Sequence, residues 1–283
     1  MIDLGILGVV EGPWRKSWTS DDALRYAVGV GATEPAFTTE NSSGVAQQAL
    51  PTMALALTHF TEPEQVFGDV DKSLILHAEQ SLTLHRPLPV AGTVEVRRRV
   101  TDIFDKGSGA LVVSRVDAVL PSGEPAFSAV SSAFLRGEGG FGGPRGSSSR
   151  EPLPARSPNS RLEFTTAANQ ALIYRLSGDR NPLHSDPVFA AQGGFPRPIL
   201  HGLCTYGIAC RLLVGAFADG DAHRVLGMAG RFTAPVTPGD VLVIDAWRDR
   251  DGVTFRTSTA AGTVVIDNGR LSLHPPEQPA TLT

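Results

Sequence analysis

A stretch rich in glycine, serine and proline divides the chain into two halves, and this division constrains the fold more than any other feature. Residues 137–149 contain six glycines and three serines, and three more prolines follow by residue 158. Such a segment offers too few apolar side chains to form a core and is typical of a linker. We therefore predict an N-terminal unit over 1–136, a linker over 137–160 and a C-terminal unit over 161–283.

The two halves repeat the same order of elements. A helix over 21–28, capped at Thr19 or the next residue, opens the first half. A helix with Ala168, Leu172 and Leu176 at four-residue spacing opens the second half. Alternating apolar residues between turn signals then predict four strands in each half. These strands span Ile75–His85, Thr93–Ile103, Ala110–Val119 and Ala126–Leu135 in the first half, and Val225–Phe232, Val241–Trp247, Val253–Thr259 and Thr263–Ile266 in the second.

A weak local repeat indicates two copies of one fold. Around residues 85–94 and again around 233–241, a strand closes at a proline and the next strand opens at a glycine. The copies differ in their central helix, because Leu203–Phe217 is long and apolar whereas Leu50–Phe60 is bounded by prolines and predicts a shorter or irregular element. A helix covered by an antiparallel sheet, occurring twice, is an α+β arrangement.

Charge and cysteine content exclude several classes of protein. With 25 basic and 29 acidic residues the net charge is −4, so we expect no nucleic-acid partner. Cys204 and Cys210 are too few for a disulfide framework, and no cysteine spacing indicates a metal site. The spacing of His59, His77 and His85 does not indicate a metal either, and we interpret them as histidines on strand surfaces.

The most apolar segment, Ile199–Phe217, contains a histidine and an arginine. It therefore predicts a buried helix rather than a membrane span. The N-terminus lacks the basic region that is typical of a signal peptide. We expect a cytoplasmic protein without membrane contact.

Residues with chemical potential concentrate between Tyr174 and Leu203. Asp179 and His184 lie five residues apart, and Pro182 between them interrupts a helix and favours a tight loop. An aspartate and a histidine that meet at one point can hold a water molecule and move protons near neutral pH.

A purely structural interpretation explains part of this loop, because Gly178 would end one helix and Asp186 would cap the next. It leaves Asp179, Asn181 and His184 unexplained, and from spacing alone both interpretations of these three stay open.

Gly202 stands at the predicted start of the apolar helix. Its backbone N–H could stabilise a carbonyl oxygen that gains negative charge, which is worth ~3 kcal/mol. The alternative is that a glycine here only permits close packing.

Two runs of residues resemble a known family. Ser-Gly-Asp-Arg-Asn-Pro-Leu-His at 177–184, led by Tyr174, and Phe-Pro-Arg-Pro-Ile-Leu-His-Gly-Leu at 195–203 are similar to the signature of MaoC-like, R-specific enoyl-CoA hydratases (hydratase 2). The resemblance implies a double hotdog, in which an antiparallel sheet wraps a helix twice, with a degenerate first repeat and a catalytic second one. It implies a catalytic dyad of Asp179 and His184, an orienting role for Asn181, and an oxyanion hole at the Gly202 N–H.

The resemblance also implies the activity. We expect (R)-specific hydration of trans-2-enoyl-CoA to (R)-3-hydroxyacyl-CoA, or the reverse dehydration, in fatty-acid or sterol side-chain β-oxidation. The partner is an acyl-CoA thioester, no cofactor or metal is required, and a homodimer is expected. The alternatives are a 3-hydroxyacyl-ACP dehydratase of fatty-acid or polyketide synthesis, an acyl-CoA thioesterase, and an acyl-CoA-binding partner with an inactive site. Which member of the dyad is the base stays open.

Three further expectations concern the surroundings of the dyad. Arg197 and Arg231 are candidates for contacts with CoA phosphates, and the alternative for each is a surface or strand-capping arginine. We expect His201 to pack or to form a hydrogen bond at the start of the apolar helix rather than to act in catalysis. The shorter element at Leu50–Phe60 would leave room for a bulky acyl tail in the first half.

Overall fold

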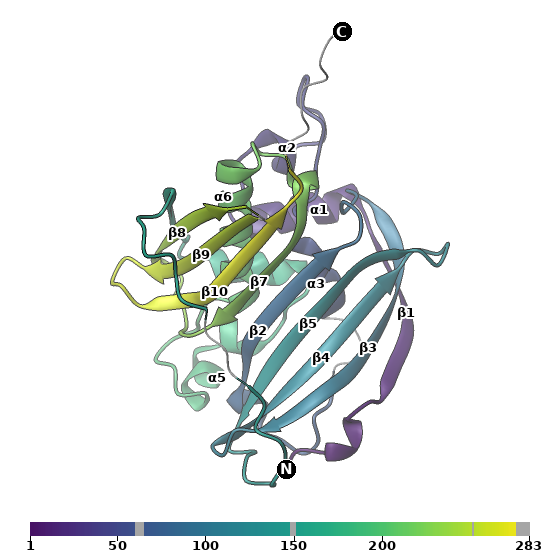
Figure 1. Cartoon of the computed structure of the whole chain (residues 1–283), viewed down its shortest axis with the longest axis vertical. Coiled ribbons are helices and arrows are strands. Elements are labelled where there is room, and N and C mark those ends of the chain that lie inside the picture. Colours follow the sequence, from purple (N-terminus) through teal and green to yellow (C-terminus); the bar gives the residue numbers. More distant parts are fainter. Residues whose placement is uncertain (60–64, 148–150, 251, 276–283) are drawn as a thin grey trace.

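The structure is a computed structural model that describes residues 1–59, 65–147, 151–250 and 252–275. Its named strands form one antiparallel sheet of ten strands in the order β1-β3-β4-β5-β2-β7-β10-β9-β8-β6 (Figure 1). The strands are β1 Val10–Trp18, β2 Ile75–Leu84, β3 Gly92–Asp105, β4 Gly109–Val119, β5 Pro125–Arg136, β6 Ser160–Thr165, β7 Val225–Phe232, β8 Val241–Asp249, β9 Gly252–Thr259 and β10 Val264–Leu273.

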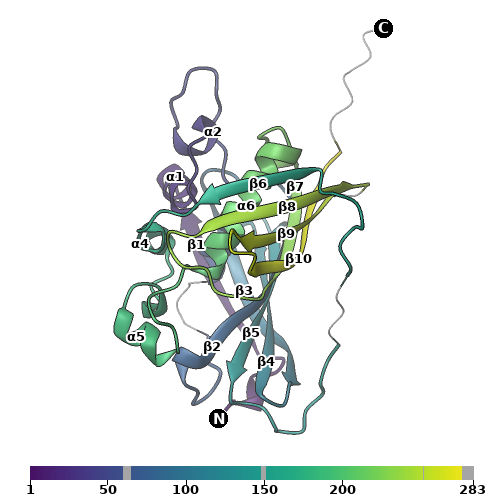
Figure 2. The ribbon, with the colours of Figure 1, turned by 90° about the vertical axis from the view of Figure 1, so that its left-hand side faces the viewer.

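The helices lie on one side of this curved sheet (Figures 1 and 2). They are α1 Ser20–Gly29, α2 Pro35–Thr38, α3 Met53–His59, α4 Gln170–Tyr174, α5 Pro187–Gln192 and α6 Gly202–Phe217. The first five strands in the sheet order come from the N-terminal half and the other five from the C-terminal half, each with its own helices. The predicted α+β double hotdog is therefore confirmed.

The two halves meet where β2 pairs with β7. In this pairing Ser81 lies opposite Ala229 and Thr83 lies opposite Gly227. A Cβ atom on Gly227 would lie only 2.5 Å from the carbonyl oxygen of Leu82, which is closer than real Cβ atoms approach a backbone atom. The continuous sheet therefore requires a glycine at this position.

The strands at the two edges of the sheet were not predicted. β1 contains Gly12 and Pro13, and its pairing with β3 is irregular between Glu11 and Trp14. β6 begins at Ser160, the last residue of the predicted linker, and pairs with β8. Both edge strands are interrupted or flanked by residues that weaken a strand pattern.

The linker is fixed to the first half at its beginning. The carboxylate of Asp105 accepts hydrogen bonds from the backbone N–H groups of Gly107, Gly140 and Gly142 at 2.8 to 2.9 Å. These bonds, with that from Gly140 foremost, lower the pKa of Asp105. The described parts of the linker then follow the sheet face opposite the helices (Figures 1 and 2).

The two central helices differ as predicted. α6 has 16 residues and is buried on almost every side, whereas α3 has only seven. Phe60, the last residue of the predicted shorter element, and Pro63 lie outside the described residues. None of the described helices has the length and apolarity needed to cross a membrane.

The predicted apolar face of the helix that opens the second half is wrong. Leu172 is 52% exposed and Leu176 is 48% exposed. The buried residues are Gln170, Ala171 and Tyr174, and the Gln170 side chain donates a hydrogen bond to the carbonyl of Gly29 in α1. The helix at the start of the first half is capped by Thr19, which exchanges hydrogen bonds with Asp22.

Candidate active site

Local hydrogen bonds shape the loop that carries the predicted dyad. Gly178 ends a short 3₁₀ turn with a φ of 130°, a conformation that favours glycine. Oδ1 of Asp179 then accepts the backbone N–H of Asn181, and Oδ1 of Asn181 accepts the backbone N–H of Leu183, both at 3.0 Å. Pro182 begins a second 3₁₀ turn that ends at His184. The Asn181 side chain therefore holds the loop and not the dyad directly.

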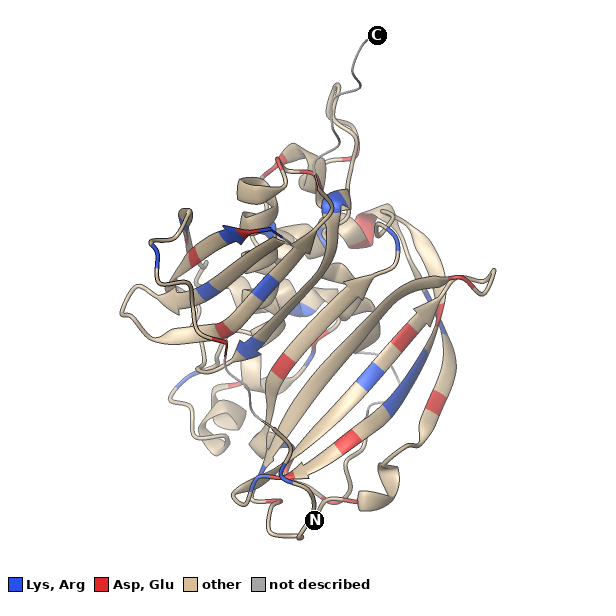
Figure 3. Cartoon of the chain, viewed as in Figure 1, with Lys and Arg blue, Asp and Glu red and all other residues tan. Residues whose placement is uncertain are grey.

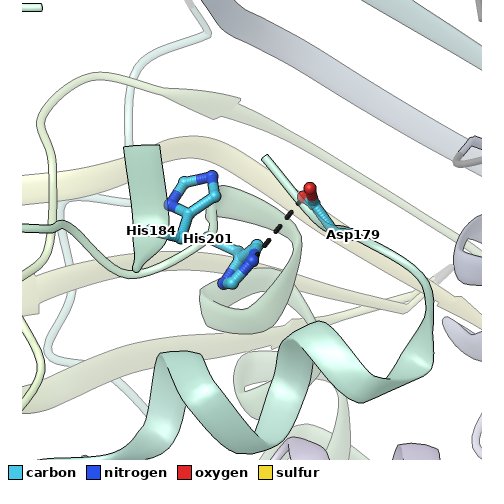
Figure 4. A group of neighbouring side chains, drawn as sticks. All are labelled: Asp179, His184 and His201. Atoms are coloured by element: carbon cyan, nitrogen blue, oxygen red, sulfur yellow. Dashed lines mark ion pairs between the residues drawn. The ribbon is translucent and has the colours of Figure 1, made fainter. Parts of the chain in front are cut away.

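The loop brings Asp179 and His184 together. One side-chain atom from each lies within 4.8 Å of the other, and Figure 4 shows both side chains together with His201. One water molecule can bridge two polar atoms at this separation, because each bond to it would be about 2.8 Å long. Nδ1 of His184 lies 2.9 Å from the carbonyl oxygen of Ile199. A carbonyl only accepts, so Nδ1 carries the proton and Nε2 is an acceptor in the neutral ring.

Burial shifts both groups away from their ordinary behaviour. It raises the pKa of Asp179 to about 6, against the opposing effect of the Asn181 N–H. Burial also lowers the pKa of His184 to about 4. Near neutral pH the site therefore presents an ionised carboxylate and a neutral imidazole, which are two acceptors and no strong acid.

His201 lies inside the site. Its Nε2 is 3.8 Å from Oδ2 of Asp179, and its ring stacks on that of His184 with the centroids 3.7 Å apart (Figure 4). The sequence indicated only packing or a hydrogen bond at the start of the helix. The signal that could have placed it here is its position directly before Gly202, in the second of the two family-like runs.

Gly202 is the first residue of α6. The first N–H groups of a helix have no acceptor within the helix and carry the positive end of its dipole. A Cβ on Gly202 would lie 3.3 Å from the ring of Phe232. Gly202 lines the same cavity as Asp179 and His184, and its N–H has no backbone acceptor among the described residues.

This cavity has a volume of about 1160 Å³ and extends from the loop into the first half. His59 of α3 and His77 of β2 line it and stack on each other, with centroids 5.0 Å apart and ring planes at 3°. His77 also contacts Phe232, with centroids 4.9 Å apart. The interpretation of His59 as a strand-surface histidine is therefore wrong, because it lies in a helix. His77 lies on a strand as predicted but lines the cavity, and His85 is exposed directly after the end of β2.

The two arginine candidates lie in different environments. Arg197 is exposed and is not among the residues that line the cavity. Arg231 lines the cavity, and its Nε lies 3.9 Å from a carboxylate oxygen of Glu79. Arg180 was missed by the sequence analysis, although it lies between Asp179 and Asn181. Arg180 is exposed and lines the cavity, so it places a positive charge beside the loop.

Known proteins resemble the chain over its whole length. Residues 149–269 match the family model described as MaoC like domain, and residues 17–137 match the MFE-2 hydratase 2 N-terminal domain. The 3-hydroxyacyl-thioester dehydratase Y of Mycobacterium tuberculosis is 47% identical over 281 residues, which cover 95% of this chain and 97% of the relative. Enoyl-CoA hydratase ChsH3 of the same organism is 43% identical over 257 residues, which cover 88% of this chain and 90% of that relative.

A solved structure has the same fold. The MaoC-like dehydratase of Phytophthora capsici superposes with a TM-score of 0.85 at 32% identity, and the match covers 96% of this chain and 97% of the other. The family resemblance found in two short runs thus extends across both halves of the protein. The chain belongs to the MaoC-like hydratase 2 family.

Proposed function

We propose that the protein hydrates trans-2-enoyl-CoA to (R)-3-hydroxyacyl-CoA, catalyses the reverse dehydration, and needs no metal or other cofactor. One observation carries the proposal: Asp179 and His184 approach each other within 4.8 Å and line one cavity with Gly202, the first residue of α6. Two acceptors can hold both hydrogens of a water molecule and leave its lone pair free, while the N–H can bind a thioester carbonyl. The names of the relatives agree with this chemistry.

The reaction needs the dyad and the N–H of Gly202 together. Attack of the water oxygen on Cβ moves the electrons of the double bond toward the thioester, so negative charge develops on the carbonyl oxygen. The N–H of Gly202 stabilises that charge. One proton of the water must leave as its oxygen bonds to Cβ, and one proton must arrive at Cα.

We assign the transfer of this proton from water to Cα to Asp179. Its pKa of about 6 exceeds the pKa of about 4 of His184, so the carboxylate is the stronger base of the two. Asp179 takes the proton from water as the C–O bond forms and returns it to Cα as the carbonyl re-forms. His184 holds the second hydrogen through Nε2. The sum is the addition of one water molecule, and the dyad ends as it began.

The rival functions would use parts of the same site. A thioesterase would direct water at the carbonyl carbon, which also puts negative charge on the carbonyl oxygen, so the Gly202 N–H suits both reactions. We favour hydration because the relatives at 47% and 43% identity are named a dehydratase and a hydratase. A dehydratase that acts on a carrier protein would share the site. We favour a CoA ester because Arg180, at the cavity, offers a cation to the phosphates of CoA.

The biological setting follows from the substrate. We place the reaction in the β-oxidation of fatty-acyl or sterol side-chain CoA esters, in the cytoplasm. A homodimer is expected from the family. Charged residues of both signs are interspersed over the sheet face in Figure 3, and this mixture does not favour a nucleic-acid partner.

The decisive experiment uses crotonyl-CoA. Hydration removes the conjugated double bond, so the absorbance of the enoyl thioester should fall, and the product should be (R)-3-hydroxybutyryl-CoA by chiral chromatography. A thiol reagent in a parallel assay detects released CoA. Formation of the S product would contradict the proposal. Release of CoA from a substrate that keeps its double bond would also contradict it, because that result is thioester hydrolysis.

A further inference from the structure

His201 occupies an unusual position for a buried polar side chain. It is 1% exposed, and its ring lies between the ring of Tyr174, with centroids 4.9 Å apart, and the ring of His184. It is the N-cap residue of α6, yet its side chain makes no capping hydrogen bond. Neither ring nitrogen makes a hydrogen bond of normal geometry among the described residues, although the backbone of Asp179 favours the protonated ring. A buried polar group without a partner is destabilising, so such a group requires an explanation.

The environment of the ring suggests that explanation. Nε2 is 3.8 Å from Oδ2 of Asp179, and Figure 4 marks this approach by a dashed line. A movement of about 1 Å would bring the two atoms within hydrogen-bond distance. Burial and the neighbouring His184 lower the pKa of His201 to about 2, so its ring is neutral and has one N–H to donate. A hydrogen bond to an ionised carboxylate is stronger than one between neutral groups.

We propose that His201 is a positioning residue, whose Nε2–H donates to the carboxylate of Asp179 and whose ring face fixes the plane of His184. The inference rests on the proposed hydratase function and extends it. The carboxylate selects the tautomer with the proton on Nε2. In this arrangement the bond holds Oδ2 in place, while Oδ1 is held by the Asn181 N–H.

The donor has a consequence for the pH dependence of the reaction. The groups that face Asp179 are Arg175, Tyr174, His184 and His201. Of these, Arg175 favours the ionised carboxylate through its charge. A hydrogen bond from His201 stabilises the same ionised form. Loss of the donor should therefore move the acid limb of the rate profile to higher pH.

Two substitutions separate the donor from the packing. His201→Phe keeps a ring against His184 and loses the donor, whereas His201→Gln keeps a donor and loses the ring. We expect His201→Phe to lower kcat on crotonyl-CoA by about 10- to 100-fold, as for partners that orient a reacting group, with KM little changed. The acid limb of the rate profile of His201→Phe should move to higher pH. His201→Gln should keep the wild-type acid limb and lose less of kcat than His201→Phe, because it loses only the ring contact with His184.

The control and the contrary results are distinct. His85→Phe makes the same change at an exposed position outside the cavity and should alter nothing. If His201→Phe does not fold, His201→Met fills the position without a donor and must show the same shift. Two results would overturn the role of His201 and leave the hydratase function standing. One is an unchanged acid limb in folded His201→Phe. The other is an equal loss of kcat in His201→Phe and His201→Gln with no shift of the limb in either. Absence of hydration by the wild-type protein would overturn the proposed function and this inference with it.

Discussion

Nδ1 of His184 donates a hydrogen bond to the carbonyl oxygen of Ile199 at 2.9 Å. This bond joins the two parts of the site, because Ile199 lies just before His201 and Gly202 at the start of α6. It also determines which nitrogen of His184 faces a bound water. The Ile199 N–H also donates to the carbonyl oxygen of Leu183 at 3.4 Å, so two hydrogen bonds at Ile199 set the position of the dyad relative to the proposed oxyanion donor.

The dyad gives the first prediction. Asp179→Asn and His184→Ala should each lower kcat for crotonyl-CoA by about 10²–10⁴-fold, because each removes one acceptor of the same water. The double variant should lose little more than the worse single variant, since the two groups act as a unit. Steady-state kinetics on proteins with matched thermal melts would measure this. Near-normal hydration by either folded variant would show that the site is assigned incorrectly.

The second prediction concerns pH. Asp179 must be ionised to take a proton from water, and burial raises its pKa to about 6. We therefore expect kcat/KM to fall as pH drops through about 6 and to level off above it. Rate profiles measured at constant ionic strength test this. A profile that instead rises as pH falls through 6 would mean that protonated Asp179 acts as the acid.

The third prediction uses the same carboxyl group as a probe of stability. The folded-state pKa of Asp179 is raised from 3.8, so its contribution to stability is full below about pH 4 and is lost as pH rises through about 6. A shift of about two units corresponds to roughly 3 kcal/mol at most. Asp179→Asn should therefore raise the urea midpoint at pH 8 and leave it unchanged at pH 4. An equal change at both values would exclude the buried charge as the cause.

Sequence patterns predicted the inner strands well and the edges poorly. The start and end of β7 agree with the prediction, because alternating apolar residues there are bounded by clear turn signals. β1 and β6 were missed because one is broken by Gly12 and Pro13 and the other adjoins the linker. The apolar face through Leu172 failed for a different reason. Ala168, Leu172 and Leu176 are all exposed, because the opposite side of this element packs against α1 through Gln170 and Tyr174.

The site was predictable where it is local in sequence. Asp179, Asn181 and His184 lie in one loop, whose shape follows from Pro182 and from two hydrogen bonds between residues two positions apart. His201 joins them only because α6 begins beside the loop. His59 and His77 reach the cavity from a helix and a strand of the other half, and no spacing in the sequence signals that contact.

The fourth prediction concerns the junction of the two halves. A Cβ on Gly227 would lie 2.5 Å from the carbonyl oxygen of Leu82, so Gly227→Ala should destabilise the protein by about 1–3 kcal/mol. Gly215 in α6 is the matched control, because a Cβ there meets nothing within 4 Å. Gly215→Ala should stabilise by about 0.5–1 kcal/mol. Urea unfolding compares them, and a Gly227→Ala midpoint at or above that of the wild type would contradict the need for glycine.

The last prediction concerns the acyl tail. The cavity extends into the first half, where α3 has only seven residues, so we expect the tail to lie there while the thioester stays beside Asp179 and Gly202. A test of this location needs a substitution that narrows the cavity in the first half. Ala54 in α3 is unsuitable, because it is fully buried in the core and does not line the cavity. Ala133 in β5 is suitable, because it lines the cavity and pairs with His77 of β2.

Ala133→Leu should displace the tail of a long substrate and leave room for a short one. Loss of contact for about two methylene groups would raise KM for a long-chain enoyl-CoA by about tenfold, while crotonyl-CoA should be little affected. Ala260→Leu makes the same change in the exposed turn between β9 and β10 and should alter neither value. Because the two substrates differ only in the tail, the ratio of their kcat/KM values isolates its binding. Equal losses on both substrates would place the tail outside the first half.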